Sequence, residues 1–214
     1  MVFRSVDLPT PFRPRTDSTR PSATSRLMLN STCAGPYQVL SSVQRSIEVL
    51  AQVDLLHPSI SAYRVGGTVE DLPAKHFDLQ IGVNLRGLFL VTQAAIPLLR
   101  ETRGWIVNLA SIAGTLPAPG LATYGATKAA VISLTHSLNE ELDADGVRAV
   151  AICPGFVDTA MAQWSGIAPD EMIRPEDCAE VVRMVLRLSP HARVPQVVIE
   201  RVGSRNGDAP LGGA

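Results

Sequence analysis

Three polar residues stand at short intervals in an otherwise apolar stretch of this 214-residue chain, SIAGTLPAPGLATYGATKAA. Tyr124 and Lys128 are four residues apart, so they share one face if the stretch is helical. An ammonium close to a phenol lowers the pKa of the phenol, because the positive charge stabilises the phenolate. The spacing therefore predicts a tyrosine that works as a general acid and base near neutral pH.

Ser111 stands at the end of the apolar run WIVNLAS, which predicts a strand buried on both faces, as in a parallel sheet. Ligands bind at the carboxyl ends of such strands. The Ser111 hydroxyl is therefore expected to donate a hydrogen bond to a substrate oxygen beside the phenol. The alternative interpretation is that Tyr124 and Lys128 are ordinary surface residues of a helix.

Other chemistries have weaker support in the sequence. Ser111 with His136 would suggest a hydrolase, but LASIA lacks the GxSxG pattern of a hydrolase nucleophile. The four histidines have no metal-ligand spacing, so no metal site is expected. The three scattered cysteines are typical of reduced thiols, with Cys153 as a buried structural residue.

The elements that must position these residues alternate between helices and strands from about residue 68 onward. Apolar periodicity predicts helices at 69–101, 122–142 and 174–188 and strands at 53–56, 105–111, 147–155 and 194–202. This alternation predicts an α/β fold with a parallel sheet and right-handed crossovers.

Composition restricts the partners and the compartment. The net charge of −1 gives no field that would attract nucleic acid, and no apolar run of about eighteen residues predicts a membrane span. Because the cysteines are odd in number and scattered, we expect a cytoplasmic protein. The charge and the short apolar runs predict no nucleic-acid and no membrane partner.

Four motifs follow one another in this half of the chain: VNLRG at 83–87, NLASIAG at 108–114, YGATK at 124–128 and CPGFVDT at 153–159. Together they resemble the short-chain dehydrogenase/reductase family over about residues 67–202. The resemblance implies a Rossmann-like, doubly wound parallel sheet. It also implies an oxidoreductase that interconverts a carbonyl and an alcohol with NAD or NADP.

The resemblance implies a role for each matching residue. Tyr124 would protonate the carbonyl oxygen as hydride arrives, and Lys128 would lower the tyrosine pKa and bind the nicotinamide ribose. Ser111 would orient the carbonyl, and Asn84 would hold a water in the proton relay. The loop that receives the nicotinamide end of the cofactor is matched by Pro154, Gly155, Val157 and Thr159.

The resemblance and the composition also predict partners. The helices that contain Asn84 and Tyr124 are those with which the family commonly dimerises, so a homodimer or homotetramer is expected. Segment 160–174 matches a substrate lid, and its apolar character favours a small hydrophobic carbonyl or alcohol substrate.

The amino-terminal part departs from the family pattern. No TGxxxGxG turn for the cofactor pyrophosphate is present, and residues 1–37 are rich in Arg, Pro, Ser and Thr. We expect a disordered leader at 1–37, with an organelle-targeting peptide as the alternative, and a truncated Rossmann-like catalytic domain at 38–214 that lacks the usual first strands. The alternative function is a non-catalytic family remnant that dimerises but cannot bind the dinucleotide.

Overall fold

The computed structural model of this protein describes residues 55–56, 64 and 66–203. The predicted leader and the rest of the chain before the first described strand lie outside these residues. Among the described residues the strands are β1 (Leu55–Leu56), β2 (Trp105–Leu109), β3 (Arg148–Pro154) and β4 (Gln196–Ile199). They form one parallel sheet in the order β1-β2-β3-β4, which confirms the predicted α/β fold with a parallel sheet.

The helices fall close to their predicted positions. They are α2 (Ala74–Gln80), the π-helical segment η1 (Ile81–Gly87), α3 (Leu88–Thr102), α4 (Ala122–Glu141) and α5 (Pro175–Leu186). The first of them begins at Ala74 rather than at residue 69, because a turn closed by Thr68 and Asp71 precedes it. Pro175 opens α5, where the missing N–H costs no helical hydrogen bond.

The two central strands alternate their side chains between the two faces of the sheet. Ile106 and Ala149 are paired across β2 and β3 and pack in a cluster with residues of α3 and α4. Val107 and Val150, one residue further along, pack on the other face against Val185 of α5. Both strands are therefore buried on both faces, as the apolar runs predict.

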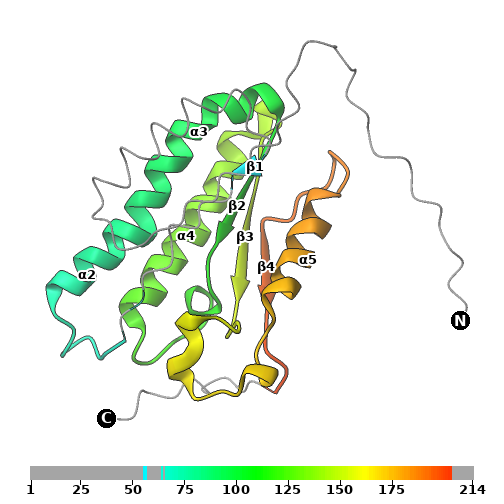
Figure 1. Ribbon diagram of the computed structural model, residues 1–214. Coiled ribbons are helices and arrows are strands. Elements are labelled where there is room, and N and C mark those ends of the chain that lie inside the picture. Colours follow the sequence, from blue (N-terminus) through cyan, green and yellow to red (C-terminus); the bar gives the residue numbers. More distant parts are fainter. Residues whose placement is uncertain (1–54, 57–63, 65, 204–214) are drawn as a thin grey trace, which may run out of the picture.

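Helix α5 covers the face of the sheet opposite α3 and α4 (Figure 1). The chain steps from β2 to β3 through α4 and from β3 to β4 through α5, moving in the same direction across the sheet. These two crossovers lie on opposite faces, so they have opposite hands. The expectation of right-handed crossovers throughout is therefore wrong for one of them. The long segment 155–174 carries the chain around the carboxyl edge of the sheet before α5 begins.

Segments α2, η1 and α3 run on as one helix, Ala74–Thr102, which is long and apolar enough to cross a membrane by length and composition alone. The sequence expectation of no such stretch is wrong on those two criteria. Core helices of soluble proteins pass the same test. Val91 and Leu99 are buried in the cluster shared with the sheet, whereas Phe77 and Phe89 are exposed. The apolar residues are thus divided between two sides of the helix.

Candidate active site

Ser111 directly follows the end of β2, as predicted, and begins a short 3-10 turn, η2 (Ile112–Gly114). Its Oγ accepts a hydrogen bond from the Ala113 N–H at 3.2 Å, which satisfies a donor at the start of the turn. The backbone thus fixes the serine at the carboxyl end of the strand, where parallel sheets bind ligands.

Two glycines bring this turn into direct contact with α4. A Cβ at Gly114 would lie 2.7 Å from the Ala129 nitrogen, and a Cβ at Gly125 would lie 2.7 Å from the Ala113 carbonyl oxygen. Such distances exclude any side chain, so only glycine permits the close approach of the two backbones. The approach seats Ser111 beside the first turn of α4.

Tyr124 lies in that first turn and is only 8% exposed. Burial raises the pKa of its phenol, while a hydrogen bond with Ser111 and the positive charge of Arg64 act in the opposite direction. The lowered tyrosine pKa expected from Lys128 is therefore not found among the groups of the protein itself. Desolvation outweighs the nearby charges, and the proton stays on the phenol.

Lys128 lies one turn further along α4 and is 2% exposed. Its Nζ donates to the Leu109 carbonyl oxygen at 2.9 Å and lies 5.6 Å from the centroid of the Tyr124 ring. Burial lowers its pKa to about 7, partly offset by the neighbouring Cys153. The predicted pair is thus brought together, with the lysine directed at the end of β2.

Asn84 is fully buried in η1 and faces α4. Its Nδ2 donates to Thr127 Oγ1 at 3.0 Å, and the Thr127 hydroxyl donates to the Tyr124 carbonyl oxygen at 2.8 Å. One turn earlier, Gln80 Nε2 donates to Thr123 Oγ1 at 3.0 Å. These contacts dock the helix of Asn84 onto α4, and the role of Asn84 in holding a water stays a prediction.

Three residues of the site were not predicted from the sequence: Thr123, Thr127 and Gln80. The sequence does contain a matching pattern. Gln80 and Asn84 are four residues apart on one helix, and the threonines that they contact are four residues apart on the other. This pattern could not be read without knowing that these two helices pack side by side.

The motif CPGFVDT crosses the carboxyl edge of the sheet. Pro154 ends β3, and the Gly155 N–H donates to the carbonyl oxygen of Ile199, the last residue of β4, at 2.8 Å. Val157 forms an isolated parallel bridge with Ile173, and exposed Thr159 precedes the 3-10 turn η4 (Ala160–Ser165). The four predicted cofactor-binding residues of this loop lie along one edge, and their contact with a cofactor stays a prediction.

The described groups fit the nicotinamide half of a dinucleotide. Burial lowers the pKa of the Lys128 ammonium, because the charged form has lost contact with water. The hydroxyl groups of a ribose could accept hydrogen bonds from it and so stabilise the charged form. The tyrosine hydroxyl and the loop at the end of β3 flank the same strand ends. The sequence departure from the glycine-rich turn falls in residues outside the described part of the chain.

Arg64 is a further residue that the sequence did not single out. Its guanidinium carbon lies 3.8 Å from the centroid of the Trp164 ring, in the segment predicted as a lid. Its positive charge also acts on Tyr124, where it offsets part of the rise in pKa that burial causes. The stretch HPSISAYRVGG around Arg64 matches no motif, so only the fold reveals this placement.

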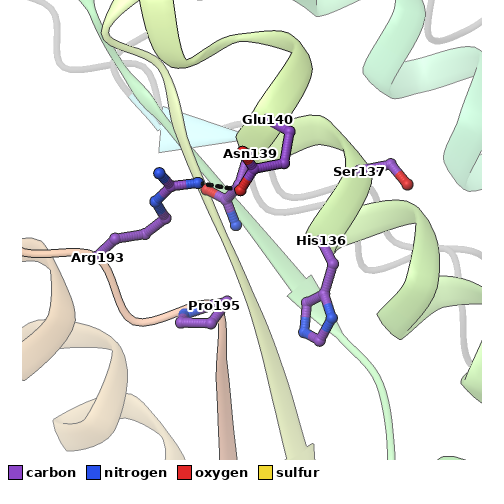
Figure 2. A pocket seen from close by; sticks show the side chains of 6 residues that line it. All are labelled: His136, Ser137, Asn139, Glu140, Arg193 and Pro195. Atoms are coloured by element: carbon purple, nitrogen blue, oxygen red, sulfur yellow. Dashed lines mark hydrogen bonds and ion pairs between the residues drawn. The ribbon is translucent and has the colours of Figure 1, made fainter.

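A cavity of about 540 Å³ lies elsewhere on α4, and Figure 2 shows the side chains around it. It is lined by His136, Ser137, Asn139, Glu140, Arg193 and Pro195. His136 is three turns beyond Tyr124, about 18 Å along the helix axis. The structure therefore does not bring His136 to Ser111, and the hydrolase alternative has no geometric support.

A second cavity, of about 630 Å³, lies between the end of β4 and the segment before α5. Glu171 and Arg201 line it and form an ion pair at 3.8 Å. Neither cavity is lined by Ser111, Tyr124 or Lys128. Among the described residues, no three or more His, Cys, Asp or Glu side chains are grouped to hold a metal ion.

Comparisons with known proteins agree with the motifs. The short chain dehydrogenase family matches residues 26–168, a range that begins well before Gly67. An uncharacterized oxidoreductase of Staphylococcus epidermidis is 34% identical over 157 residues, which cover 73% of this chain and 68% of that protein. The 2-(R)-hydroxypropyl-CoM dehydrogenase of Xanthobacter autotrophicus is 33% identical over 141 residues, which cover 64% of this chain and 56% of that protein.

Solved structures are similar to this fold as well. An alcohol dehydrogenase from the archaeon Thermococcus sibiricus, complexed with 5-hydroxy-NADP, has a TM-score of 0.70 and 26% identity, covering 80% of this chain and 72% of that one. A 3-ketoacyl-(acyl-carrier-protein) reductase from Brucella melitensis, complexed with NADH, has a TM-score of 0.66 and 26% identity, covering 78% and 72%. These matches support oxidoreduction with a nicotinamide dinucleotide.

Proposed function

Because the chain belongs to the short-chain dehydrogenase/reductase family, we propose that it interconverts a carbonyl and an alcohol with NAD(P)(H), using Tyr124 as the general acid and base. The observation that carries this proposal is the convergence of three predicted residues at the end of β2. Ser111 lies close enough to Tyr124 to act on the pKa of its phenol, and Lys128 lies against the same strand end. A dinucleotide would supply or accept the hydride.

The neighbouring hydroxyls of Ser111 and Tyr124 can both donate to one carbonyl oxygen. As negative charge develops on that oxygen, the two hydrogen bonds strengthen, and the phenol transfers its proton. Because the pKa of Tyr124 is raised, the phenol stays protonated until negative charge develops on the carbonyl oxygen. Reduction therefore yields an alcohol and a transient phenolate.

The phenolate is buried, so it depends on nearby positive charge. The ammonium of Lys128 and the guanidinium of Arg64 supply that charge. Lys128 would also bind the ribose of the dinucleotide, with Pro154, Gly155, Val157 and Thr159 beside the nicotinamide. In the oxidative direction the phenolate accepts the alcohol proton, which balances the loss of hydride.

The substrate that fits this proposal has a small apolar body. Met161 and Trp164 leave apolar surface exposed on the segment after the loop, which favours a hydrophobic carbonyl compound. Comparing kcat/KM along a series of ketones that share one head group and differ in alkyl length tests this, because a preference for the shortest member would contradict it.

We also propose that the protein is a cytoplasmic homodimer or homotetramer. Phe77 and Phe89 are exposed on the helix that carries Asn84, and a second copy would bury such rings. Light scattering should give twice or four times the mass of the chain. A mass of one chain at micromolar concentration would contradict the proposal, and recovery in the membrane fraction would contradict the compartment.

Titration with NADH and NADPH separates the enzyme from a non-catalytic family member that dimerises without the dinucleotide. The missing TGxxxGxG pattern favours the non-catalytic alternative. Nicotinamide fluorescence should change saturably as protein is added, and the same protein should then reduce a ketone. No binding at millimolar dinucleotide would contradict the proposed enzyme and favour the alternative.

A further inference from the structure

Arg64 is held near the candidate site by contacts on two sides. Its guanidinium stacks on the ring of Trp164, with the carbon 3.8 Å from the ring centroid. The backbone just beyond it is fixed to the start of α4, because the Gly67 N–H donates to the Gly120 carbonyl oxygen at 2.8 Å. The cation therefore sits between the segment 160–174 and the helix that carries Tyr124.

The hydrogen-bonding capacity of Arg64 is not used by the described residues. Its Nε is buried without a hydrogen-bond partner, and no described carboxylate forms an ion pair with it. A buried donor without an acceptor carries a desolvation cost, which is larger for a charged group. A buried donor of this kind calls for an explanation, and a ligand that supplies the acceptor is one.

A second arginine shows the same stacking without this feature. Arg148 lies 4.0 Å over the ring of Trp105, and its Nη1 donates to the Ser189 carbonyl oxygen at 3.3 Å. Trp105 is buried at the start of β2, away from the carboxyl edge of the sheet, whereas Trp164 is exposed. Packing therefore explains the stacking of Arg148 on Trp105. Packing does not explain why the Nε donor of Arg64 is buried without an acceptor.

We propose that Arg64 recognises a carboxylate on the substrate, so the site acts on oxo acids and the corresponding hydroxy acids with an apolar body. This inference rests on the proposed function. A guanidinium stacked by its face keeps the N–H groups of its edge free for a bidentate carboxylate. The stacking on Trp164 and the bond from Gly67 to Gly120 hold Arg64 beside the start of α4. Its charge acts on the Tyr124 phenol from there, so an oxo acid held by its carboxylate can present its carbonyl on the side of the phenol.

Turnover of 3-oxobutanoate and its methyl ester tests this recognition. The two substrates share the carbonyl and differ in the charge that Arg64 would contact. Arg64→Met keeps the apolar stem and should lower the acid-to-ester ratio of kcat/KM by about 10- to 100-fold, as expected for a hydrogen bond to a charged group. Arg148→Met removes the matched stacked cation and should leave the ratio unchanged. An equal loss for both substrates in Arg64→Met would show a merely structural arginine and overturn the proposal.

A binding measurement distinguishes failure of this inference from failure of the proposed function. The chain has two tryptophans, so Trp105→Phe leaves Trp164 as the reporter. Titration with 3-oxobutanoate should change its fluorescence saturably, the ester should not, and Arg64→Met should abolish the change. Saturable binding without turnover would sink the proposed function alone. No saturable change, or a change that survives Arg64→Met, would overturn the role of Arg64. A variant that loses affinity only for NADH or NADPH would overturn it too.

Discussion

Helix α4 carries buried polar side chains at both of its ends, and their partners differ. At the far end, Asn139 donates to the Ala149 carbonyl oxygen at 2.7 Å and accepts from the Ala149 N–H at 2.8 Å. Near the middle, Thr135 accepts from Asn108 of β2 at 2.9 Å. Asn139 thus satisfies backbone groups of β3, and Thr135 joins the helix to β2 through a side chain.

At the near end of α4, the buried polar groups carry a free-energy cost instead. Burial raises the pKa of Tyr124 and lowers the pKa of Lys128 to about 7, so neither charged form is well stabilised by the protein. Groups perturbed in this way cluster at functional sites. The end of α4 near Asn139 thus stabilises the fold, whereas the end with Tyr124 and Lys128 holds groups with shifted pKa values, as an active site does.

The largest effect should come from Tyr124→Phe. Loss of the phenolic proton donor should lower turnover by about 10²- to 10⁴-fold, with little change in dinucleotide affinity or thermal midpoint. Initial rates of nicotinamide oxidation measure turnover, and a melting curve measures the thermal midpoint. Tyr37→Phe, which removes the same hydroxyl outside the motif, is the control. Unchanged turnover would refute Tyr124 as the acid.

At the other end of α4, Asn139→Ala should act on stability. The change leaves the buried N–H and C=O groups of Ala149 unpaired, so the free energy of unfolding should fall by about 2–4 kcal/mol. Urea denaturation measures it, with exposed Ser137→Ala as the control. A loss no larger than that of the control would mean that the anchor is dispensable.

The pH dependence of stability should distinguish Lys128 from an exposed lysine. Since its pKa is lowered to about 7 in the folded chain, the unfolded chain holds the extra proton above that pH. The free energy of unfolding should therefore rise from pH 7 to about 9, by at most about 1.4 kcal/mol per pH unit. Above pH 9 the raised pKa of Cys153 acts in the opposite direction.

Lys128→Met should remove this rise, whereas Lys75→Met, at an exposed position of α2, should keep it. Urea denaturation at several pH values provides the measurement. A slope that persists unchanged in Lys128→Met would show that another group causes it.

The smallest effect is expected for Arg193→Ala. Arg193 forms an ion pair with Glu140 at 2.7 Å (Figure 2) and another with Asp143 at 3.2 Å. All three side chains are exposed to solvent. Exposed pairs contribute little, so the free energy of unfolding should fall by less than about 1 kcal/mol, with turnover unchanged. A loss of turnover would show that the end of α4 near Glu140 also contributes to function.

Local periodicity was enough to predict the parallel sheet and the helices that follow each strand. The spacing of Tyr124 and Lys128 also placed them correctly in the first two turns of α4, because i and i+4 positions share a face. Ser111 could be placed because the apolar run before it ends where the strand ends. These features depend on residues close together in the sequence.

Features that depend on packing between distant segments were not predictable. The sign of the Tyr124 pKa shift follows from burial, which spacing does not reveal. Arg64 meets Trp164 only because the fold brings the two segments together. The hand of the α5 crossover likewise depends on which face the helix covers, and apolar periodicity is the same for either face.

Transfer of deuteride tests the central claim most directly. With NADH or NADPH deuterated at the transferable position of nicotinamide and a ketone substrate, mass spectrometry of the product reports hydride transfer alone. We predict one deuterium on the carbinol carbon with the unaltered protein, and about 10²- to 10⁴-fold slower labelling with Tyr124→Phe. Equal labelling rates for both proteins, or no label from either dinucleotide, would contradict the assignment of Tyr124 as the acid of an oxidoreductase.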